Sequence, residues 1–277
     1  MASHRTPRVV AARKLATRSG RRRTGRFLVE GAQGVAEALG YGRVHELFVT
    51  DAAMTRHAQL LELAKRTDVP LTGITQRAAE LLSETVTPQG IVAVCDSVAT
   101  PVRHAVTETA ALVAVLVDVA DPGNAGSVVR TADAVGADAV VFAGDSVDPH
   151  NGKCVRASTG SLFHLPVARC GRDEALVACR AAGLSISATT GVDGTALTEV
   201  TDWGRPRAWL FGSEAHGLPA EVMARADERL RVPIYGSAES LNLGTAAAVC
   251  LYAAAMASHS DGPAGPSGDR LPYNPGT

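Results

Sequence analysis

Aromatic side chains and long apolar runs are both scarce in this sequence of 277 residues. Phe, Trp and Tyr together make up 4% of the chain, so a core must be built mainly from Ala, Val and Leu. No apolar run reaches the roughly 18 residues that a membrane-spanning helix needs. No apolar segment follows the charged N-terminus either, so we expect neither a membrane anchor nor a secretory signal. Hydrophobic residues still make up 46% of the chain, which is typical of a globular protein.

Cysteine is also sparse, and its spacing does not suit metal binding. The five cysteines are scattered, with no CxxC pair and no His at metal-ligand spacing. An odd number of widely spaced thiols indicates reduced cysteines in a cytoplasmic protein rather than a disulfide framework or a zinc site. The sequence therefore predicts a cytoplasmic protein that binds no metal.

The charge is nearly balanced overall but unevenly distributed. Lys and Arg number 27 against 28 acidic residues, which gives a net charge of −1. Residues 1–26 nevertheless contain nine basic residues and no acidic one. Such a block attracts polyanions, most often nucleic acid, although a solvated tail without a partner has the same composition. We expect residues 1–24 to form a basic, flexible arm.

The residues after this arm follow an alternating strand and helix pattern. Strand-like runs such as RFLVE (26–30) alternate with stretches of helical apolar spacing as far as residue 98. This alternation predicts a small α/β domain over residues 25–98. The polar segment 99–109 contains one proline and predicts a linker.

A second α/β domain is predicted over residues 110–258. It begins with the strongly apolar strand 111–117, and its further strands alternate with helices, which is typical of a parallel sheet. Its last helix, 245–257, is almost wholly apolar and is therefore expected to be buried. The Gly-, Pro- and Ser-rich residues 259–277 predict a disordered tail.

The first candidate site follows the strand 111–117. A glycine-containing turn is predicted over 118–126 and a helix over 127–135, and such a junction forms an anion or cofactor cradle in many α/β proteins. The GxGxxG fingerprint of dinucleotide-binding domains is absent. Asn124 could simply support the turn. Arg130 could be an ordinary surface arginine, or Arg130 and the helix N-terminus could both face one phosphate.

Two more candidate segments lie near the C-terminus. FGSEAHGL (211–218) follows a predicted strand, and its glycines would let the backbone approach a ligand closely. It lacks the GxSxG pattern of a serine hydrolase. In LRVPIYGSAESLNLG (230–244), Ser240 and Asn242 precede the apolar helix. They could cap this helix, contact a ligand, or do both.

Taken in order, these three segments resemble the motifs of SPOUT-superfamily methyltransferases of the TrmH/SpoU branch. The resemblance covers about residues 112–257, while residues 25–31 and 87–90 are similar to the small substrate-binding domain often found ahead of it. It implies an α/β fold in which a C-terminal parallel-sheet SPOUT domain with a trefoil knot follows that small domain. It also implies S-adenosylmethionine as cofactor and a homodimer. Two departures are Val232-Pro233-Ile234, where Ile-Pro-Met is usual, and Leu243-Gly244, where Val-Ser is usual.

The resemblance also implies roles for individual residues. The catalytic constellation is expected at Asn124, Arg130, Glu214, Ser240 and Asn242. Cofactor contacts are expected at Thr189, Gly212, Val232 and Leu241. RNA contacts are expected at Arg130 and Arg156. Because an arginine almost never gives up its proton in a protein, we expect Arg130 to stabilise the attacking oxygen rather than to act as the general base.

The predicted function is therefore methyl transfer from S-adenosylmethionine to a ribose 2′-hydroxyl of RNA. The separate N-terminal domain favours ribosomal RNA over transfer RNA as the substrate, by analogy with family members that carry one. A non-catalytic RNA-binding protein of the same fold is an alternative, against which the intact motif residues argue. A nucleotide-dependent oxidoreductase would need the full glycine fingerprint and ranks last.

Overall fold

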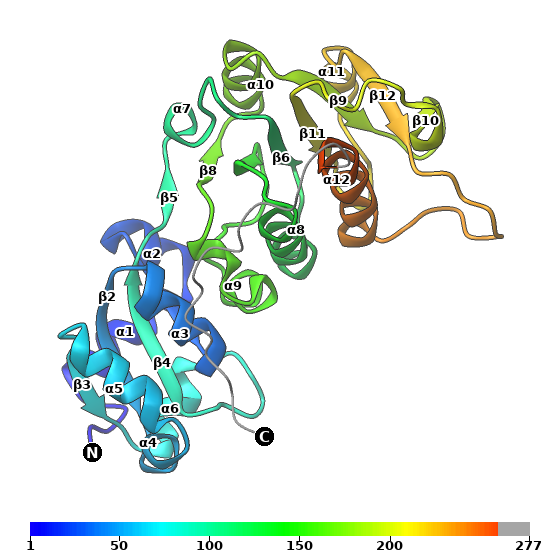
Figure 1. The fold of residues 1–277 in the computed structure, drawn as a ribbon. Helices are drawn as coiled ribbons and strands as arrows, with labels where there is room; N and C mark the ends of the chain where they lie inside the picture. Colours follow the sequence, from blue (N-terminus) through cyan, green and yellow to red (C-terminus); the bar gives the residue numbers. More distant parts are fainter. Residues whose placement is uncertain (260–277) are drawn as a thin grey trace. The chain divides into compact units, whose positions relative to one another are not determined.

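The computed structural model describes residues 1–259, which form two compact units (Figure 1). Unit 1 contains residues 1–98 and 150–164, and unit 2 contains residues 99–149 and 165–259. Both units are α/β, as the alternating pattern predicted. Among the helices of the described residues, none combines the length and apolar character that crossing a membrane requires. The predicted tail, apart from residue 259, lies outside the described residues.

Unit 1 is built on a four-stranded sheet with the strand order β1-β4-β2-β3. The strands are β1 (Arg26–Glu30), β2 (Val44–Val49), β3 (Leu71–Gly73) and β4 (Ile91–Asp96). The helices are α3 (Ala32–Tyr41), α4 (Asp51–Arg56), α5 (Ala58–Arg66), α6 (Gln76–Leu82) and α9 (Gly152–Ser158), with a short 3₁₀ helix at Ser161–Phe163. Strand β4 pairs antiparallel with β1 and β2, whereas β2 and β3 are parallel.

The basic N-terminus is helical, so the prediction of a flexible arm was wrong. It forms α1 (Pro7–Arg13), a 3₁₀ turn (Lys14–Ala16) and α2 (Arg18–Thr24). Apolar side chains of α1 and the 3₁₀ turn are buried in one hydrophobic cluster with residues of the sheet and α6. The buried Arg21 donates from Nη1 to the carbonyl oxygens of Leu15 and Ala16, at 3.0 and 2.9 Å. The prediction weighed the charges of this segment and overlooked its regularly spaced apolar residues.

Unit 2 is built on an eight-stranded sheet with the order β10-β12-β9-β11-β6-β7-β8-β5. Every neighbouring pair is parallel, as predicted. The strands are β5 (Ala99–Thr100), β6 (Leu112–Val117), β7 (Ala139–Ala143), β8 (Val167–Cys170), β9 (Ser185–Thr189), β10 (Thr195–Ala196), β11 (Arg207–Phe211) and β12 (Glu228–Arg231). The trefoil knot that the family resemblance implies stays a prediction.

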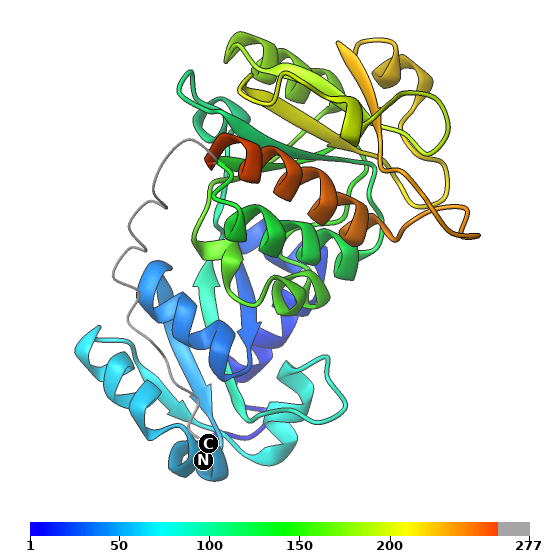
Figure 2. The same cartoon turned by 45° about the vertical axis from the view of Figure 1, so that its right-hand side comes forward.

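Helices cover both faces of this sheet. They are α7 (Val102–Ala105), α8 (Pro122–Ala134), α10 (Arg172–Ala181), α11 (Ala220–Met223) and α12 (Leu243–His259), with a 3₁₀ turn at Leu197–Glu199. Side chains of α7, α10 and α11 share a core with one face of the strands. Helices α8 and α12 lie side by side (Figure 2), and both contact the sheet. Because successive side chains of a strand point to opposite faces, Trp209 and Phe211 of β11 do not belong to the first core.

Three boundaries differ from the prediction. Residues 99–109 are part of unit 2 rather than a linker, because Val102 and other apolar residues of α7 are buried in its core. Helix α8 begins at Pro122 instead of residue 127, since Asp121 caps it and a proline at the first helical position needs no N–H partner. Residues 150–164 belong to unit 1, although they lie far from it in sequence.

Helix α12 is buried on one side only, so the prediction of a buried helix holds for that side alone. The buried residues are Ala247, Cys250, Leu251 and Ala254. Large apolar side chains on its other side are exposed, namely Val249, Tyr252 and Met256. Composition could not distinguish these two sides because both are apolar.

Candidate functional site

The candidate site of unit 2 lies at the carboxyl edge of the parallel sheet. Strands β12, β9 and β11 are neighbours, and parallel strands end at the same edge of a sheet. The loops that follow these three strands line a cavity of about 570 Å³, the usual position of a ligand site in an open α/β sheet. All four residues expected to contact the cofactor line this cavity, namely Thr189, Gly212, Val232 and Leu241.

The cavity has an apolar wall and a more polar rim. Apolar lining residues include Leu218, Leu230, Ile234 and Leu243, while Thr190, Glu239 and Ser240 supply hydroxyl and carboxyl groups. Burial raises the pKa of the Cys250 thiol, which also lines the cavity, to about 12. This cysteine is therefore a neutral apolar contact and not a nucleophile.

A tight turn after β11 forms one side of the cavity. Ser213 and Gly217 exchange backbone hydrogen bonds of 3.1 and 2.8 Å, and Gly217 has a φ of 66°. A Cβ on Gly212 would lie 2.2 Å from the carbonyl carbon of Gly217, so only glycine fits there. The Ser213 hydroxyl accepts a hydrogen bond from the backbone N–H of His216 at 3.2 Å. No hydrogen bond joins the His216 imidazole to this hydroxyl among the described residues, which argues against a hydrolase.

A chain of hydrogen bonds brings together three of the five expected catalytic residues. Asn124 Nδ2 donates to Glu214 Oε1 at 2.7 Å, and Asn242 Nδ2 donates to Asn124 Oδ1 at 2.9 Å. Asn242 Oδ1 in turn accepts from the backbone N–H of Gly244 at 2.9 Å, and so it caps α12. The two amides are fixed in orientation because each uses its oxygen as acceptor and its nitrogen as donor. Asn242 therefore both caps α12 and belongs to the candidate site.

The other two expected catalytic residues lie apart from this chain of hydrogen bonds. Ser240 lines the cavity together with Glu214 and Asn242. Arg130 lies on α8 and is exposed, and it is not among the residues that line the cavity. Among residues 1–259, no hydrogen bond or ion pair engages its guanidinium group. Arg130 is therefore available to a ligand that arrives from solution.

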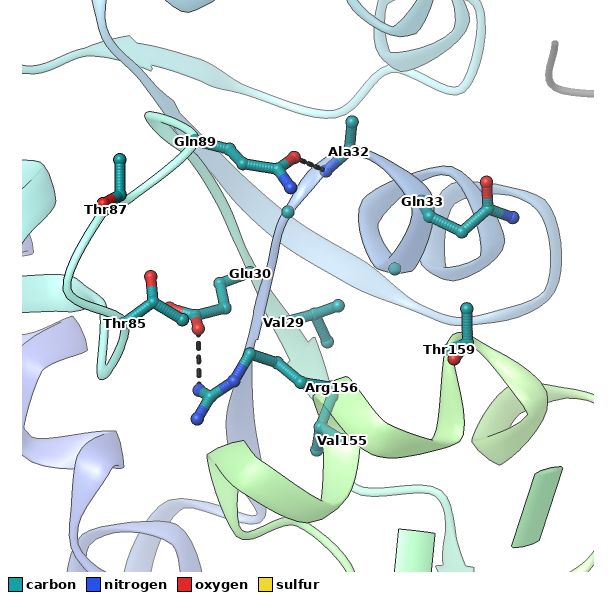
Figure 3. A pocket seen from close by; sticks show the side chains of 12 residues that line it. Val29, Glu30, Ala32, Gln33, Thr85, Thr87, Gln89, Val155, Arg156 and Thr159 are labelled. Carbon is teal, nitrogen blue, oxygen red and sulfur yellow. Dashed lines mark hydrogen bonds and ion pairs between the residues drawn. The ribbon is translucent and has the colours of Figure 1, made fainter. Parts of the chain in front are cut away.

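Arg156 lies in unit 1, on α9. Its Nη1 atom is 2.7 Å from Glu30 Oε1 and 3.6 Å from Glu84 Oε2. Arg156 and Glu30 border a second cavity of about 240 Å³ (Figure 3), which is also lined by the expected substrate-domain residues Gly31, Thr87 and Gln89. The structure thus places the two arginines expected to contact RNA in different units.

Some residues of the first cavity were not predicted individually. Residues 190–192 follow β9 directly, and His216 and Met223 come from the segment after β11. Their position after neighbouring parallel strands is the signal that would have found them. No group of three or more His, Cys, Asp or Glu side chains that could hold a metal ion occurs in the described part of the chain.

Two family models match this chain. The model described as the SpoU rRNA methylase family matches residues 111–252, which contain the cavity of unit 2 and its hydrogen-bonded asparagines. The chain belongs to the SpoU rRNA methylase family. A model described as the MRM3-like substrate binding domain matches residues 6–93. This second match begins ahead of α1, so it includes the basic helices of this SpoU family member.

Characterised proteins resemble the chain over most of its length. The 23S rRNA (guanosine(2553)-2′-O)-methyltransferase RlmP of Bacillus subtilis is 37% identical over 87% of this chain and 92% of its own. The 23S rRNA (uridine(2479)-2′-O)-methyltransferase of Streptomyces viridochromogenes is 34% identical over 87% of this chain and 86% of its own. The crystal structure of the SpoU methyltransferase AviRb from the same organism, in complex with the cofactor AdoMet (S-adenosylmethionine), superposes with a TM-score of 0.81 at 28% identity. It covers 92% of this chain and 99% of that chain, which confirms the predicted family and fold class.

Proposed function

We propose that this chain transfers a methyl group from S-adenosylmethionine to a ribose 2′-hydroxyl of ribosomal RNA. The observation that carries the proposal is the hydrogen-bonded chain Glu214–Asn124–Asn242 beside the cavity at the carboxyl edge of the sheet. It combines a ligand-sized cavity with fixed polar groups in a SpoU family member. Similar proteins bear the names of 23S rRNA 2′-O-methyltransferases, which supports ribosomal RNA as the substrate.

The residues of the cavity fit S-adenosylmethionine. Leu218, Leu230 and Leu241 offer apolar surface to an adenine ring, and glycines at positions 191 and 212 allow close approach of the backbone. Glu239 and Ser240 can hold the polar amino-acid and ribose groups. When bound, the cofactor supplies a methyl group on a sulfonium, which an oxygen nucleophile attacks in line.

Arg130 stabilises the negative charge that develops on the attacking 2′-oxygen. A ribose hydroxyl is a poor nucleophile at neutral pH, so a fixed cation close to it lowers the barrier. Arg130 is exposed on α8 and no described carboxylate neutralises it, which leaves its guanidinium for the RNA. It also grips the neighbouring phosphate, and the proton leaves to that phosphate or to water because an arginine does not accept it.

Asn124 and Glu214 act as positioning residues. The carboxylate of Glu214 fixes the side-chain amide of Asn124, which is linked through Asn242 to the first turn of α12. The N-terminal turns of α8 and α12 are thereby locked together at the edge of the cavity. Ser240, just ahead of α12, shapes the entrance through which the acceptor ribose approaches.

Transfer of tritium from labelled S-adenosylmethionine to ribosomal RNA tests the activity, and mapping of the 2′-O-methyl groups identifies the nucleotide. If no RNA were labelled, the chain would be a non-catalytic RNA-binding protein and the proposed activity would be refuted. Labelling of transfer RNA alone would refute ribosomal RNA as the substrate. The variant Arg130→Lys keeps the positive charge but loses the planar guanidinium, which can donate two parallel hydrogen bonds. We therefore expect kcat to fall by about tenfold or more. A nearly unchanged kcat with only weaker RNA binding would contradict a transition-state role for Arg130.

The basic helices supply affinity for the RNA backbone. Six exposed cations of this segment have no acidic partner among the described residues, namely Arg5, Arg13, Lys14, Arg18, Arg22 and Arg23. Since each phosphate contact adds about 0.7–0.9 to the slope of log K against log salt, Arg22→Gln should lower that slope by this amount. The same change at Arg77, which pairs with Glu80, should leave the slope unchanged.

We also propose that the chain forms a homodimer through α12. Val249, Tyr252 and Met256 recur at helical spacing and expose apolar surface on one side of this helix. Met256→Arg should convert a dimer into a monomer in sedimentation analysis, whereas Val177→Arg, at an exposed apolar residue of α10, should not. A monomeric wild-type chain would refute the dimer. We further propose that the chain acts in the cytoplasm, because ribosomal RNA is its proposed substrate.

A further inference from the structure

The cavity of unit 1 is held open by cross-links between its walls (Figure 3). On one side, Arg156 Nη1 of α9 binds Glu30 Oε1 at the end of β1, and Glu30 Oε2 accepts hydrogen bonds from the Ser83 hydroxyl and the Glu84 N–H. On the other side, Gln89 Oε1 accepts from the N–H of Ala32 at 2.8 Å. The cavity is therefore preorganised rather than a gap between mobile loops.

The charges at this cavity do not favour a phosphate. The guanidinium of Arg156 is shared by the carboxylates of Glu30 and Glu84, so its charge is more than balanced by nearby negative charge. A phosphate would have to enter beside the Glu30 carboxylate, which lies at the cavity itself. A neutral ligand that forms hydrogen bonds avoids this repulsion.

The unused polar groups of the cavity determine which neutral ligand fits. Gln89 must turn its oxygen to the N–H of Ala32, so its Nε2 group is fixed as a donor, and no other described residue accepts from it. The Thr87 hydroxyl is engaged by no described residue. The Thr85 hydroxyl already bonds the Ser83 hydroxyl at 2.8 Å and the Thr159 hydroxyl donates to the carbonyl oxygen of Ala157 at 3.4 Å, but both can still accept a hydrogen bond. Val155 and the stem of Arg156 provide apolar surface. The cavity, at about 240 Å³, is smaller than a site for a drug-sized ligand.

We infer that this cavity binds one unstacked nucleobase of the RNA substrate, and that it selects a base with a carbonyl group beside a ring N–H on its pairing edge, such as uracil. Gln89 Nε2 donates to that carbonyl, and a threonine hydroxyl accepts from the ring N–H beside it. Single-stranded bases are usually read in this way, by hydrogen bonds to their splayed edges. The inference rests on the proposed function only in taking RNA as the substrate.

The position of the cavity relative to the basic helices supports a nucleotide as the ligand. Glu30 and Arg156 also line a smaller cavity, whose other side is formed by Leu15, Ala16 and Arg21 of the basic segment. The base site and the basic helices are thus neighbours within unit 1. A strand whose phosphates contact these helices can place a base in the cavity.

Binding of labelled oligouridylate and oligocytidylate of equal length to the full chain tests the inference. Uracil and cytosine have the same size, but in cytosine an amino group replaces one carbonyl group and the adjacent ring nitrogen carries no hydrogen. The wild-type chain should bind oligouridylate about tenfold more tightly, as expected for one well-formed base contact. Equal affinity for the two oligonucleotides would overturn the inference.

The variant Gln89→Glu provides the decisive comparison. It keeps an oxygen that can accept from the Ala32 N–H but replaces the donor by an acceptor, so the preference for uridylate should disappear or reverse. Gln59→Glu makes the same change of charge on the exposed side of α5 and should keep the preference. A preference that survives in Gln89→Glu, or that is lost in both variants, would refute the assignment. Methyl transfer is measured separately, so a chain that shows the Gln89-dependent preference without transfer refutes only the proposed function.

Discussion

The turn after β11 offers a sharp test of how the cofactor cavity is built. A Cβ added to Gly212 would lie 2.2 Å from the carbonyl carbon of Gly217 and 2.4 Å from the backbone nitrogen of Leu218. Ordinary contacts of a Cβ begin at 3.4 Å, so the first of these falls short by 3.4 − 2.2 = 1.2 Å. Both opposing atoms belong to the backbone and cannot move aside by a change of rotamer. The variant Gly212→Ala must therefore open the turn that Ser213 and Gly217 close.

We expect Gly212→Ala to lower the free energy of unfolding by about 3 kcal/mol, the upper end of the usual cost of overpacking, since backbone must move. For a unit of this size that loss corresponds to a fall in Tm of about 6–12 °C, which scanning calorimetry resolves. Because the displaced turn lines the cavity, the affinity for S-adenosylmethionine measured by titration calorimetry should fall by about tenfold or more.

Gly191 provides the matched control. It lines the same cavity, but a Cβ on Gly191 would meet no atom within 4 Å. Gly191→Ala should therefore leave the Tm within about 2 °C of the wild-type value, as expected for a change of roughly 0.5 kcal/mol. If Gly212→Ala matched this control in both stability and cofactor affinity, the turn would not be the rigid wall that the structure describes, and the argument would be refuted.

Three further predictions concern the polar network and the ionisable groups. Asn124→Asp sets a second carboxylate against Glu214, so kcat should fall about tenfold. Adding Glu214→Gln removes this repulsion and should restore kcat in part. A kcat that is unchanged in both variants would contradict the positioning role. The pKa of the Asp227 carboxyl lies below its usual value. Burial by itself would raise this pKa, but hydrogen bonds from the Ile186 N–H and the Arg180 guanidinium stabilise the charged carboxylate and lower it. Asp227→Asn should therefore lower the free energy of unfolding by about 1 kcal/mol at pH 7. This difference from the wild-type chain should vanish as the pH falls through the lowered pKa in the acid range, which chemical denaturation at several pH values can measure. Burial also raises the pKa of four of the five thiols, so a thiol reagent should titrate almost none in the native chain and all five after denaturation, and fast native reaction would be evidence against this packing.

The sequence by itself determined the class of the fold and the place of the cofactor site. Strongly apolar strands such as 111–117 alternate with helices, and this pattern leaves few arrangements other than a parallel sheet. The carboxyl ends of parallel strands share one edge, so the segments after β9, β11 and β12 had to meet there. The residues expected to contact the cofactor accordingly line one cavity.

Other features depended on contacts between residues far apart in the chain. The hydrogen bonds from Asn124 to Glu214 and Asn242 span 90 and 118 residues, and no local pattern encodes such pairs. The same holds for the pairing of Arg156 with Glu30, which assigns α9 to the first unit across 126 residues.

Only the tertiary structure decided which apolar side chains of the N-terminal segment and of α12 are buried. The basic N-terminus has the charge of a flexible arm, yet its few apolar residues find a core to pack against and make it helical. Helix α12 is apolar all round, yet the sheet covers only one side of it. In both segments the composition determines how apolar or charged each side chain is, but the neighbours in the folded chain determine whether it is buried. Hydrophobic stabilisation depends on the apolar area removed from water, and only the tertiary structure fixes that area.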